Sequence, residues 1–152
     1  MTADQELTET WTRLMGLFLS RRNVLFAAMA ELQLTPPHGH ALVTLLHNGP
    51  TRMRDMASNM ACDASYITAV ADRLEELGFA TRRPADDDRR VKELALTPKG
   101  QKVAARLDAV FTDPPDSLQA LSAADRAALG RIAKLLFDDQ PDTDWMPARN
   151  LR

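Results

Sequence analysis

The chain has 152 residues, of which 45% are hydrophobic and 26% are charged, with a net charge of −2 and one cysteine. This composition is typical of a soluble globular protein, and it excludes a disordered chain, a bilayer-spanning protein and a disulfide framework. The polar, acidic start from Met1 to Leu7 does not resemble a secretory signal, and together with the lone Cys62 it predicts a cytoplasmic protein.

The first predicted element is a long amphipathic helix from about Ala3 to Leu32. Its apolar residues recur at spacings of three and four, which is the helical period. They are Leu7, Trp11, Leu14, Met15, Phe18, Leu25, Met29 and Leu32. Further apolar residues at Leu17, Leu19 and Val24 widen this stripe beyond what one core contact needs, so a second buried face is expected.

Three shorter helices are predicted next. Thr35-Pro36-Pro37 is a typical capped helix start, and Asn48-Gly49-Pro50 ends that helix. Thr51 is expected to cap a short helix that carries Met53, Met56, Ala57 and Met60. After the turn Ala61-Cys62-Asp63, Asp63 is expected to cap a third helix that ends at Gly78. The apolar face of this third helix consists of Ile67, Val70, Ala71, Leu74 and Leu77.

The period then changes to that of a β-hairpin. Phe79 to Arg83 and Val91 to Leu96 are predicted strands, and the polar segment 85–90 connects them. Thr97-Pro98 starts another helix, which ends at Asp113-Pro114-Pro115.

The last predicted helix begins at Ser122 with Asp125, in a pattern that resembles a capping box. This helix is expected to bury Leu129, Ile132, Leu135 and Leu136. The polar tail after Pro141 is expected to be poorly ordered.

Two short helices joined by a tight turn and followed by a charged hairpin indicate a winged helix-turn-helix in a mainly α (α+β) protein. The apolar side of the helix 63–77 holds it to the domain, so the opposite side is expected to face a DNA groove. The residues expected to contact DNA from this helix are Ala64, Ser65, Tyr66, Thr68 and Arg73. The hydroxyl groups among them suit contacts with base edges or phosphates.

Basic residues around this helix are expected to contact the DNA backbone. Arg52 and Arg54, placed on the preceding helix, suit phosphate contacts. The hairpin adds Arg82, Arg83, Arg89, Arg90 and Lys92. An arginine at the hairpin tip can enter a narrow minor groove, and Asp88 is expected to hold the Arg90 guanidinium in a bidentate pair. A solvated hairpin without any ligand is the alternative interpretation.

The charge distribution agrees with a basic centre. Residues 51–106 hold 11 Lys/Arg and 9 Asp/Glu, whereas the remaining residues hold 8 and 12. Acidic flanks can therefore mask a slightly basic DNA-binding region.

Several motifs resemble the wing signature of the MarR family in order and spacing, and the similarity extends from roughly Leu7 to Asp139. They are Leu74-Glu75-Glu76-Leu77-Gly78-Phe79, Arg82-Arg83, Asp88-Arg89-Arg90 and Leu96-Thr97-Pro98-Lys99-Gly100, preceded by Asn48-Gly49-Pro50. The resemblance implies a two-stranded wing, Asp88 and Arg90 as the wing pair, and residues 65–73 as the reading face. Asp113-Pro114-Pro115 departs from the family, which usually has a long helix there.

The resemblance also implies a homodimer with interleaved N- and C-terminal dimerisation helices. Residues 1–34 and 98–140 would form this helical region, residues 35–97 the DNA-binding domain, and residues 141–152 a flexible tail. The terminal helices also hold more apolar surface than a compact monomer needs. The residues expected at the dimer interface are Leu7, Trp11, Leu14, Leu118, Leu129, Ile132 and Leu136. A two-fold dimer predicts a near-palindromic operator.

The family resemblance further implies release from DNA by a small aromatic or phenolic ligand. Candidate residues for this effector are Trp11, Met15, Phe18, Arg22, His38 and His40. For any one aromatic residue of this stripe, core or interface packing is the favoured alternative.

Other functions are less well supported by the residues. His38, His40, His47 and Cys62 are zinc-ligand types, but their spacing does not favour a metal site, and no cofactor is expected. We expect a transcriptional regulator, a repressor, and not an enzyme. The alternatives are a winged-helix module that binds another protein without DNA, and a regulator switched by a metal or by the Cys62 thiol.

Overall fold

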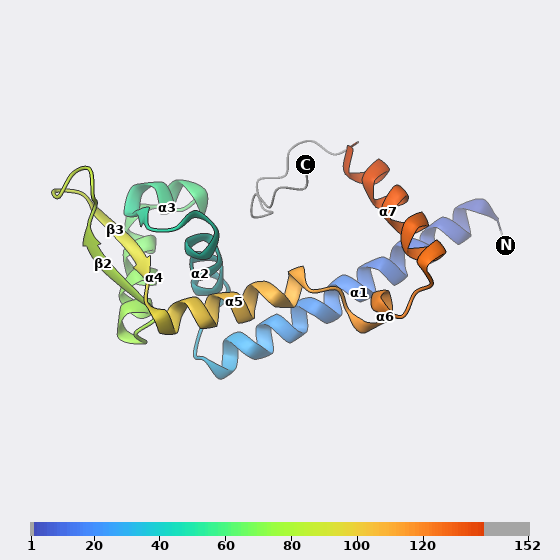
Figure 1. Cartoon of the computed structure of the whole chain (residues 1–152), viewed down its shortest axis with the longest axis horizontal. Coiled ribbons are helices and arrows are strands. Elements are labelled where there is room, and N and C mark those ends of the chain that lie inside the picture. Colours follow the sequence, from blue (N-terminus) through green and yellow to red (C-terminus); the bar gives the residue numbers. More distant parts are fainter. Residues whose placement is uncertain (1, 139–152) are drawn as a thin grey trace. The chain divides into compact units, whose positions relative to one another are not determined.

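The structure is a computed structural model that describes residues 2–138 (Figure 1), and it divides into two compact units with a boundary between Phe111 and Thr112. Elements before the boundary, in chain order, are α1 (Ala3–Glu31), α2 (Pro36–Asn48), β1 (Thr51–Arg52), α3 (Met53–Asn59), α4 (Ala64–Glu76), β2 (Ala80–Pro84), β3 (Lys92–Leu96) and α5 (Pro98–Thr112). The second unit contains α6 (Asp116–Gln119) and α7 (Ala123–Asp138). Among the described helices, none has the length and apolarity that a bilayer crossing requires.

The predicted helix boundaries are confirmed at the positions where a capping residue determines them. Thr35 is the N-cap of α2, and its hydroxyl lies 2.7 Å from the His38 ring nitrogen Nδ1. At the other end of α4, Gly78 has a φ of +71°, a left-handed conformation that glycine adopts without strain. The Ser122 hydroxyl accepts from the backbone N–H of Asp125 at 3.1 Å and so starts α7.

The predicted two-stranded wing is confirmed as the hairpin of β2 and β3, and β1 adds a third antiparallel strand in the order β1-β3-β2. Leu94 in β3 pairs with Thr51 on one side and with Arg82 on the other. The prediction that Thr51 caps a helix was wrong, because this residue lies in β1 and its hydroxyl donates to the Gly49 carbonyl at 3.0 Å. Arg52 is the last residue of β1 and the N-cap of α3, so the prediction that it lies on this helix was wrong.

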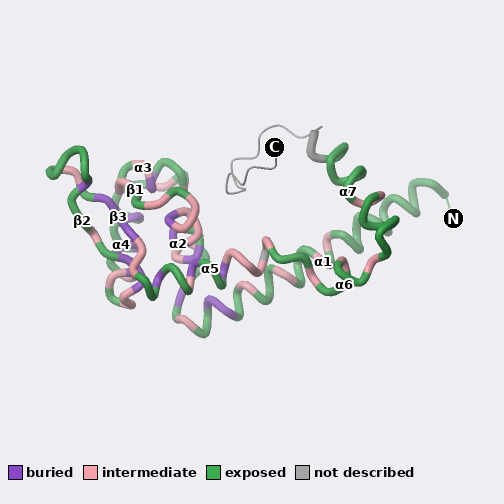
Figure 2. Tube along the Cα trace, in the orientation of Figure 1, coloured by how far each residue is buried: buried purple, intermediate pink, exposed green. Residues whose placement is uncertain are grey.

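The hydrophobic core is formed mainly by α2, α3, α4, α5 and the sheet (Figure 2). Its largest fully buried side chains are Leu42, Met56, Ile67, Leu74, Leu94 and Leu107, which come from five different elements. α1 adds only Ala28 and Met29, near its C-terminal end, to the buried residues. Toward the N-terminal end of α1 the apolar stripe is exposed among the described residues, with Leu7 70% exposed and Trp11 58% exposed.

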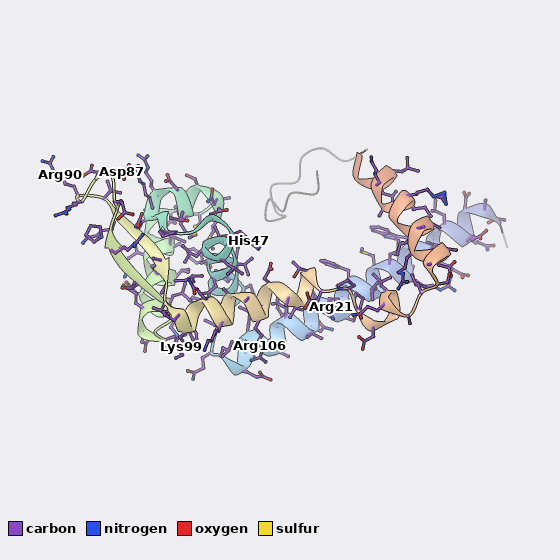
Figure 3. The ribbon with its side chains drawn as sticks, viewed as in Figure 1. Arg21, His47, Asp87, Arg90, Lys99 and Arg106 are labelled. Atoms are coloured by element: carbon purple, nitrogen blue, oxygen red, sulfur yellow. The ribbon has the colours of Figure 1, made fainter. Side chains whose placement is uncertain are left out.

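Polar contacts hold α5 beside α1 and α2 in the first unit (Figure 3). Arg106 pairs with Glu31 at 2.8 Å, and the Arg21 Nε donates to the Val110 carbonyl at 2.7 Å, so α1 and α5 run antiparallel. The His47 Nε2 lies 2.9 Å from the Asp108 carboxylate and joins α2 to α5.

The second unit differs from the sequence prediction in two ways. The short helix α6 was not predicted, although the break at residues 113–115 is confirmed. The prediction that α7 buries its apolar side was wrong for this single chain, since Ile132 is 53%, Leu135 71% and Leu136 59% exposed. The predicted tail lies outside the described residues.

The start of α5 is fastened to the turn between α4 and β2. The Thr97 hydroxyl donates to the Gly78 carbonyl at 2.7 Å and accepts from the Gly100 N–H at 3.0 Å. The Thr97 N–H donates to the Phe79 carbonyl at 3.0 Å. Lys99 donates to the Leu77 carbonyl at 2.9 Å, and its ammonium group lies 4.7 Å from the centre of the Phe79 ring. This explains why threonine, lysine and glycine occur together in the motif.

Gly100 tests this junction, because a Cβ at this position would lie 1.7 Å from the Phe79 carbonyl oxygen. We expect Gly100→Ala to lower the free energy of unfolding by about 3 kcal/mol, the cost of forcing an atom into packed backbone. Urea unfolding followed by circular dichroism measures it. The control Gly16→Ala meets no atom within 4 Å and is expected to be neutral or stabilising by up to ~1 kcal/mol. Equal stability of the two variants would contradict the close packing of α5 against Phe79.

Candidate nucleic-acid interface

Helix α4 is docked by one side and free on the other, as predicted. Ile67, Val70, Ala71 and Leu74 are at most 4% exposed, which confirms the predicted apolar face. The opposite side carries exposed Ala64, Ser65, Tyr66 and Thr68, and Tyr66 is 46% exposed. A helix held in this way can present its first turns to a groove without losing contact with its domain.

The first turn of α4 is organised by Asp63. Its carboxylate accepts from the Tyr66 N–H at 2.7 Å and from the Ser65 hydroxyl at 2.6 Å. These two hydrogen bonds, the Ser65 hydroxyl first, hold the pKa of Asp63 below its ordinary value of 3.8. The Thr68 hydroxyl donates to the Ala64 carbonyl at 2.8 Å. Both hydroxyls therefore donate within the chain and keep lone pairs that can accept from an outside donor.

The tip of the wing carries two exposed arginines, Arg89 and Arg90 (Figure 3). Among residues 2–138, neither of them has a carboxylate within ion-pair distance, and the same is true of Lys92. The expected bidentate pair is not formed, because the Asp88 carboxylate accepts from the backbone N–H of Arg90 at 3.0 Å instead. Asp88 thus shapes the turn and leaves the Arg90 guanidinium free to reach outward.

The other predicted DNA contacts are engaged within the chain. Arg83 pairs with the buried Glu93 at 2.7 Å, and Arg73 pairs with Glu76 at 2.6 Å. Arg54 pairs with its neighbour Asp55 at 3.1 Å and is 78% exposed, so it can still turn to a phosphate. These pairs show that the basic residues around α4 differ in how freely they can meet an anion.

Arg52 and Arg82 are the most constrained of these cations. Arg52 forms an ion pair with Asp87 in the wing loop, which lowers the pKa of that carboxyl. Arg82 pairs with Asp72 and Glu75 on α4. Sequence reasoning missed Asp87 and Glu75 as partners. The spacing of Asp72 and Glu75, on the same helix face as Thr68, was a usable signal for a cation crossing that face.

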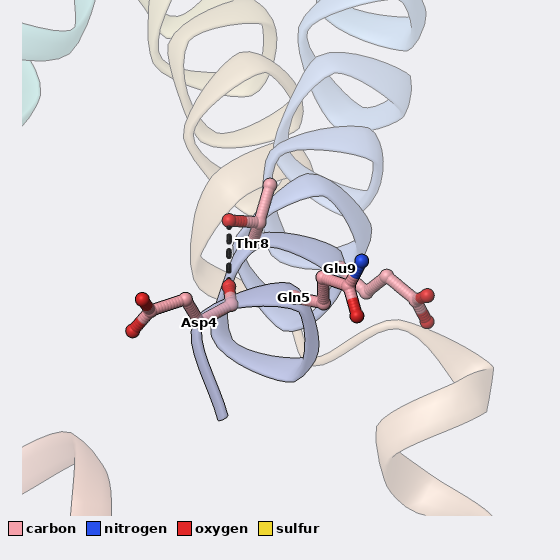
Figure 4. Close-up of a pocket in the computed structure, with 4 residues that line it drawn as sticks. All are labelled: Asp4, Gln5, Thr8 and Glu9. Atoms are coloured by element: carbon pink, nitrogen blue, oxygen red, sulfur yellow. Dashed lines mark hydrogen bonds between the residues drawn. The ribbon is translucent and has the colours of Figure 1, made fainter. Parts of the chain in front are cut away.

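The six candidate effector residues do not line either of two hollows in the described part of the chain. One hollow lies at Asp4, Gln5, Thr8 and Glu9 at the start of α1 (Figure 4), and the other is a groove of about 520 Å³ between α6 and α7. Burial lowers the pKa of His40, and burial together with the charge of Arg73 lowers that of His38, which favours the neutral form of both rings.

A metal centre finds no support in the arrangement of side chains. Within residues 2–138, no three His, Cys, Asp or Glu side chains come together as a ligand set. Cys62 is a partly exposed free thiol in the turn between α3 and α4.

The cap at Asp63 predicts a pH-dependent stability. A carboxyl whose pKa is depressed on folding stabilises the protein above the unfolded value, and this contribution is lost as the pH falls through the lower folded value. We expect Asp63→Ala to be less stable than the parent at neutral pH, and the gap in unfolding midpoint to narrow below about pH 3.8. Thermal unfolding across this range, with Asp86→Ala as a control, measures the gap. A gap independent of pH would show that the charge of Asp63 is unimportant.

The comparisons with known proteins agree with this geometry. The model of the MarR family matches residues 34–92, from just before α2 to the start of β3. The HTH-type transcriptional repressor MdtR of Bacillus subtilis (strain 168) is 30% identical over 99 residues, which are 65% of this chain and 64% of that protein. The chain thus covers less than two thirds of the length of this curated relative, and 61% of a second one from the same organism.

Solved structures share the fold over most of the chain. The YusO protein from Bacillus subtilis has a TM-score of 0.73 and 26% identity, and covers 92% of this chain and 100% of its own. The MepR–DNA complex of S. aureus has a TM-score of 0.60 and 16% identity over 87% of this chain and 99% of its own. The two relatives from Bacillus subtilis are named an HTH-type transcriptional repressor and an HTH-type transcriptional regulator. Residues 34–92 therefore match the MarR family, and the fold around them is shared by the YusO protein over most of the chain.

Proposed function

We propose that the chain is a transcriptional repressor that binds double-stranded DNA as a homodimer. The observation that carries this proposal is the one-sided burial of α4. Its apolar side is in the core, while Ser65, Tyr66 and Thr68 are exposed beside a wing with two free arginines. Base-edge contacts from the helix and phosphate or minor-groove contacts from the wing are what a winged helix-turn-helix requires.

The relatives add support of a different kind. One relative is named a transcriptional repressor, and a protein that shares the fold is described in complex with DNA. The net charge of −2 is compatible with this function, because much of the acidic charge near α4 is paired with arginines inside the chain.

The homodimer is supported by apolar side chains that one chain leaves uncovered. Leu7, Trp11, Leu14 and Phe18 form a stripe along one face of α1 and are between 41% and 70% exposed. Ile132 and Leu136 lie one turn apart on α7 and are also exposed, and Leu118 and Leu129 line the groove of α6 and α7. Contiguous apolar surface of this kind marks an association site. Residues 1–34 and 98–140 would form the dimerisation region, and residues 35–97 would bind DNA.

A two-fold dimer would place two copies of α4 about one helical turn of DNA apart. The operator is therefore expected to be near-palindromic. Selection of duplexes from a random pool by the purified chain tests this. An enriched inverted repeat supports the proposal, whereas a pool that shows no enrichment would favour a winged-helix module that binds another protein.

The proposed release signal is a small aromatic or phenolic ligand. Such a ligand can dissociate the complex only if it prefers the free spacing of the two α4 helices over the DNA-bound spacing. Trp11, Met15, Phe18, Arg22, His38 and His40 are the proposed contacts, and Arg22 already lies over the Phe26 ring at 5.3 Å. A panel of phenols and aromatic acids added to the selected complex tests this, and an unchanged complex throughout would remove this part of the proposal.

Arg90→Ala is expected to weaken binding to the selected duplex at least ~fivefold and to lower the salt slope by about one for each subunit, because a phosphate contact is lost. Fluorescence anisotropy at several salt concentrations measures both quantities. The control is Arg13→Ala, which removes the same charge from an exposed i,i+4 pair with Glu9 on α1. Equal effects of the two substitutions would remove the wing from the interface.

Leu136→Asp is expected to shift the dimer to monomer, because a charge would enter the proposed apolar interface. Sedimentation velocity measures the change, and DNA affinity is expected to fall with it. Lys134→Asp lies on another face of α7 and is expected to leave the dimer intact. A stable dimer of Leu136→Asp would place the interface elsewhere.

A further inference from the structure

Arg82 lies at the junction of the wing and α4, and its contacts are unlike those of the other wing arginines. Its guanidinium pairs with Glu75 through one terminal nitrogen, and with Asp72 at 2.6 Å through the other. The second nitrogen also donates to the Thr68 carbonyl at 3.1 Å. The backbone N–H of Arg82 donates to the Glu75 carboxylate at 2.6 Å. Glu75 therefore holds both the main chain and the side chain of one strand residue.

The three partners lie on one face of α4. Thr68, Asp72 and Glu75 are spaced by four and three residues, so they follow each other along the helix over two turns. Arg82 lies across this face, and its side chain is only 23% exposed. Burial opposes the charge of Arg82, but the hydrogen bonds to Asp72 and Glu75 raise its pKa above the ordinary value. Both terminal nitrogens are thus already engaged within the chain and are poorly placed to meet a phosphate.

The same residue is the middle residue of β2, the strand at one edge of the sheet. Arg82 is the Cα partner of Leu94, which is fully buried and is also paired with Thr51 in β1. A shift of Arg82 relative to α4 would therefore change the position of the hairpin that carries Arg89 and Arg90. The contact links the segment that would read base edges to the segment that would reach the adjacent groove.

We propose that Arg82 is a positioning residue that fixes the wing against α4 and does not itself contact DNA. This inference rests on the proposed function for its consequence in binding. For a substitution of Glu75, this positioning role predicts a change in DNA affinity opposite in sign to the change that charge alone predicts. Removing the negative charge of Glu75 would strengthen DNA binding if only electrostatics mattered, whereas loss of the positioning contact weakens it.

The first measurement needs no DNA. In Glu75→Ala, the amide hydrogen of Arg82 is expected to exchange with solvent at least ~tenfold faster than in the parent, because no side-chain acceptor remains at this position. The Leu94 amide, in the middle strand, is expected to keep its protection, which shows that the sheet remains folded. An unchanged exchange rate at Arg82 would overturn the proposal whether or not the chain binds DNA.

The second measurement is a double-mutant cycle on the duplex selected by the parent chain. Arg90→Ala is expected to cost about tenfold in affinity in the parent, but less than about twofold in the Glu75→Gln background, where the wing is no longer held in place. Asp86→Asn is the matched control, since it removes one charge from the wing at a carboxylate that is 92% exposed. In that background the cost of Arg90→Ala is expected to remain about tenfold.

Arg82→Lys separates a positioning role from a phosphate contact. Lysine keeps the charge but replaces the planar guanidinium, which contacts these partners through two separate nitrogens, by a single ammonium nitrogen that cannot reproduce this geometry. The proposal therefore predicts that Arg82→Lys weakens binding as much as Glu75→Gln does. An affinity and salt slope like those of the parent would show that Arg82 acts as a simple cation, and equal costs of Arg90→Ala in all backgrounds would show that the wing does not depend on it.

Discussion

The junction at residues 77–79 is the constraint on which the arrangement of the first unit depends. Three successive backbone carbonyls at the end of α4 accept hydrogen bonds from the start of α5, through the Lys99 ammonium and the hydroxyl and N–H of Thr97. Three elements, α4, β2 and α5, therefore meet at one short segment, and the lack of a side chain at Gly100 lets α5 approach it closely. α4 ends and the wing begins at this segment. Contacts at residues 77–79 therefore set the orientation of the wing relative to α4, at a place where neither of them would touch DNA.

The basic residues around this junction fall into two groups with different roles. Arg52, Arg82 and Arg83 are paired with carboxylates on another element or strand, and they hold the sheet, the wing loop and α4 together. Arg89 and Arg90 at the wing tip have no such partner among residues 2–138. The neutralised acidic residues explain how a chain with a net charge of −2 can still present positive charge where a nucleic acid would approach.

The sequence was sufficient for elements whose boundaries depend on local chemistry. The caps at Thr35 and Asp63, the stop at Gly78 and the apolar face of α4 need only neighbours in the chain, and all were predicted. β1 was missed because a two-residue strand has no period and exists only through its pairing with β3. The wrong assignment of Asp88 to the Arg90 guanidinium, and the missed role of Glu75, have the same cause. Sequence spacing gives proximity but cannot say which atoms of two nearby residues will meet.

The hydrogen bond from the Arg82 N–H to Glu75 has a consequence for the sheet as well as for the wing. Strands at the margin of a sheet offer unpaired N–H and carbonyl groups, and these can recruit a strand from another molecule. In this chain β1 covers one side of β3, and a helix carboxylate occupies a donor on the outer side of β2. The hairpin can therefore remain long and prominent while offering fewer sites for unwanted self-assembly, which is an advantage for a protein that must expose it to solvent.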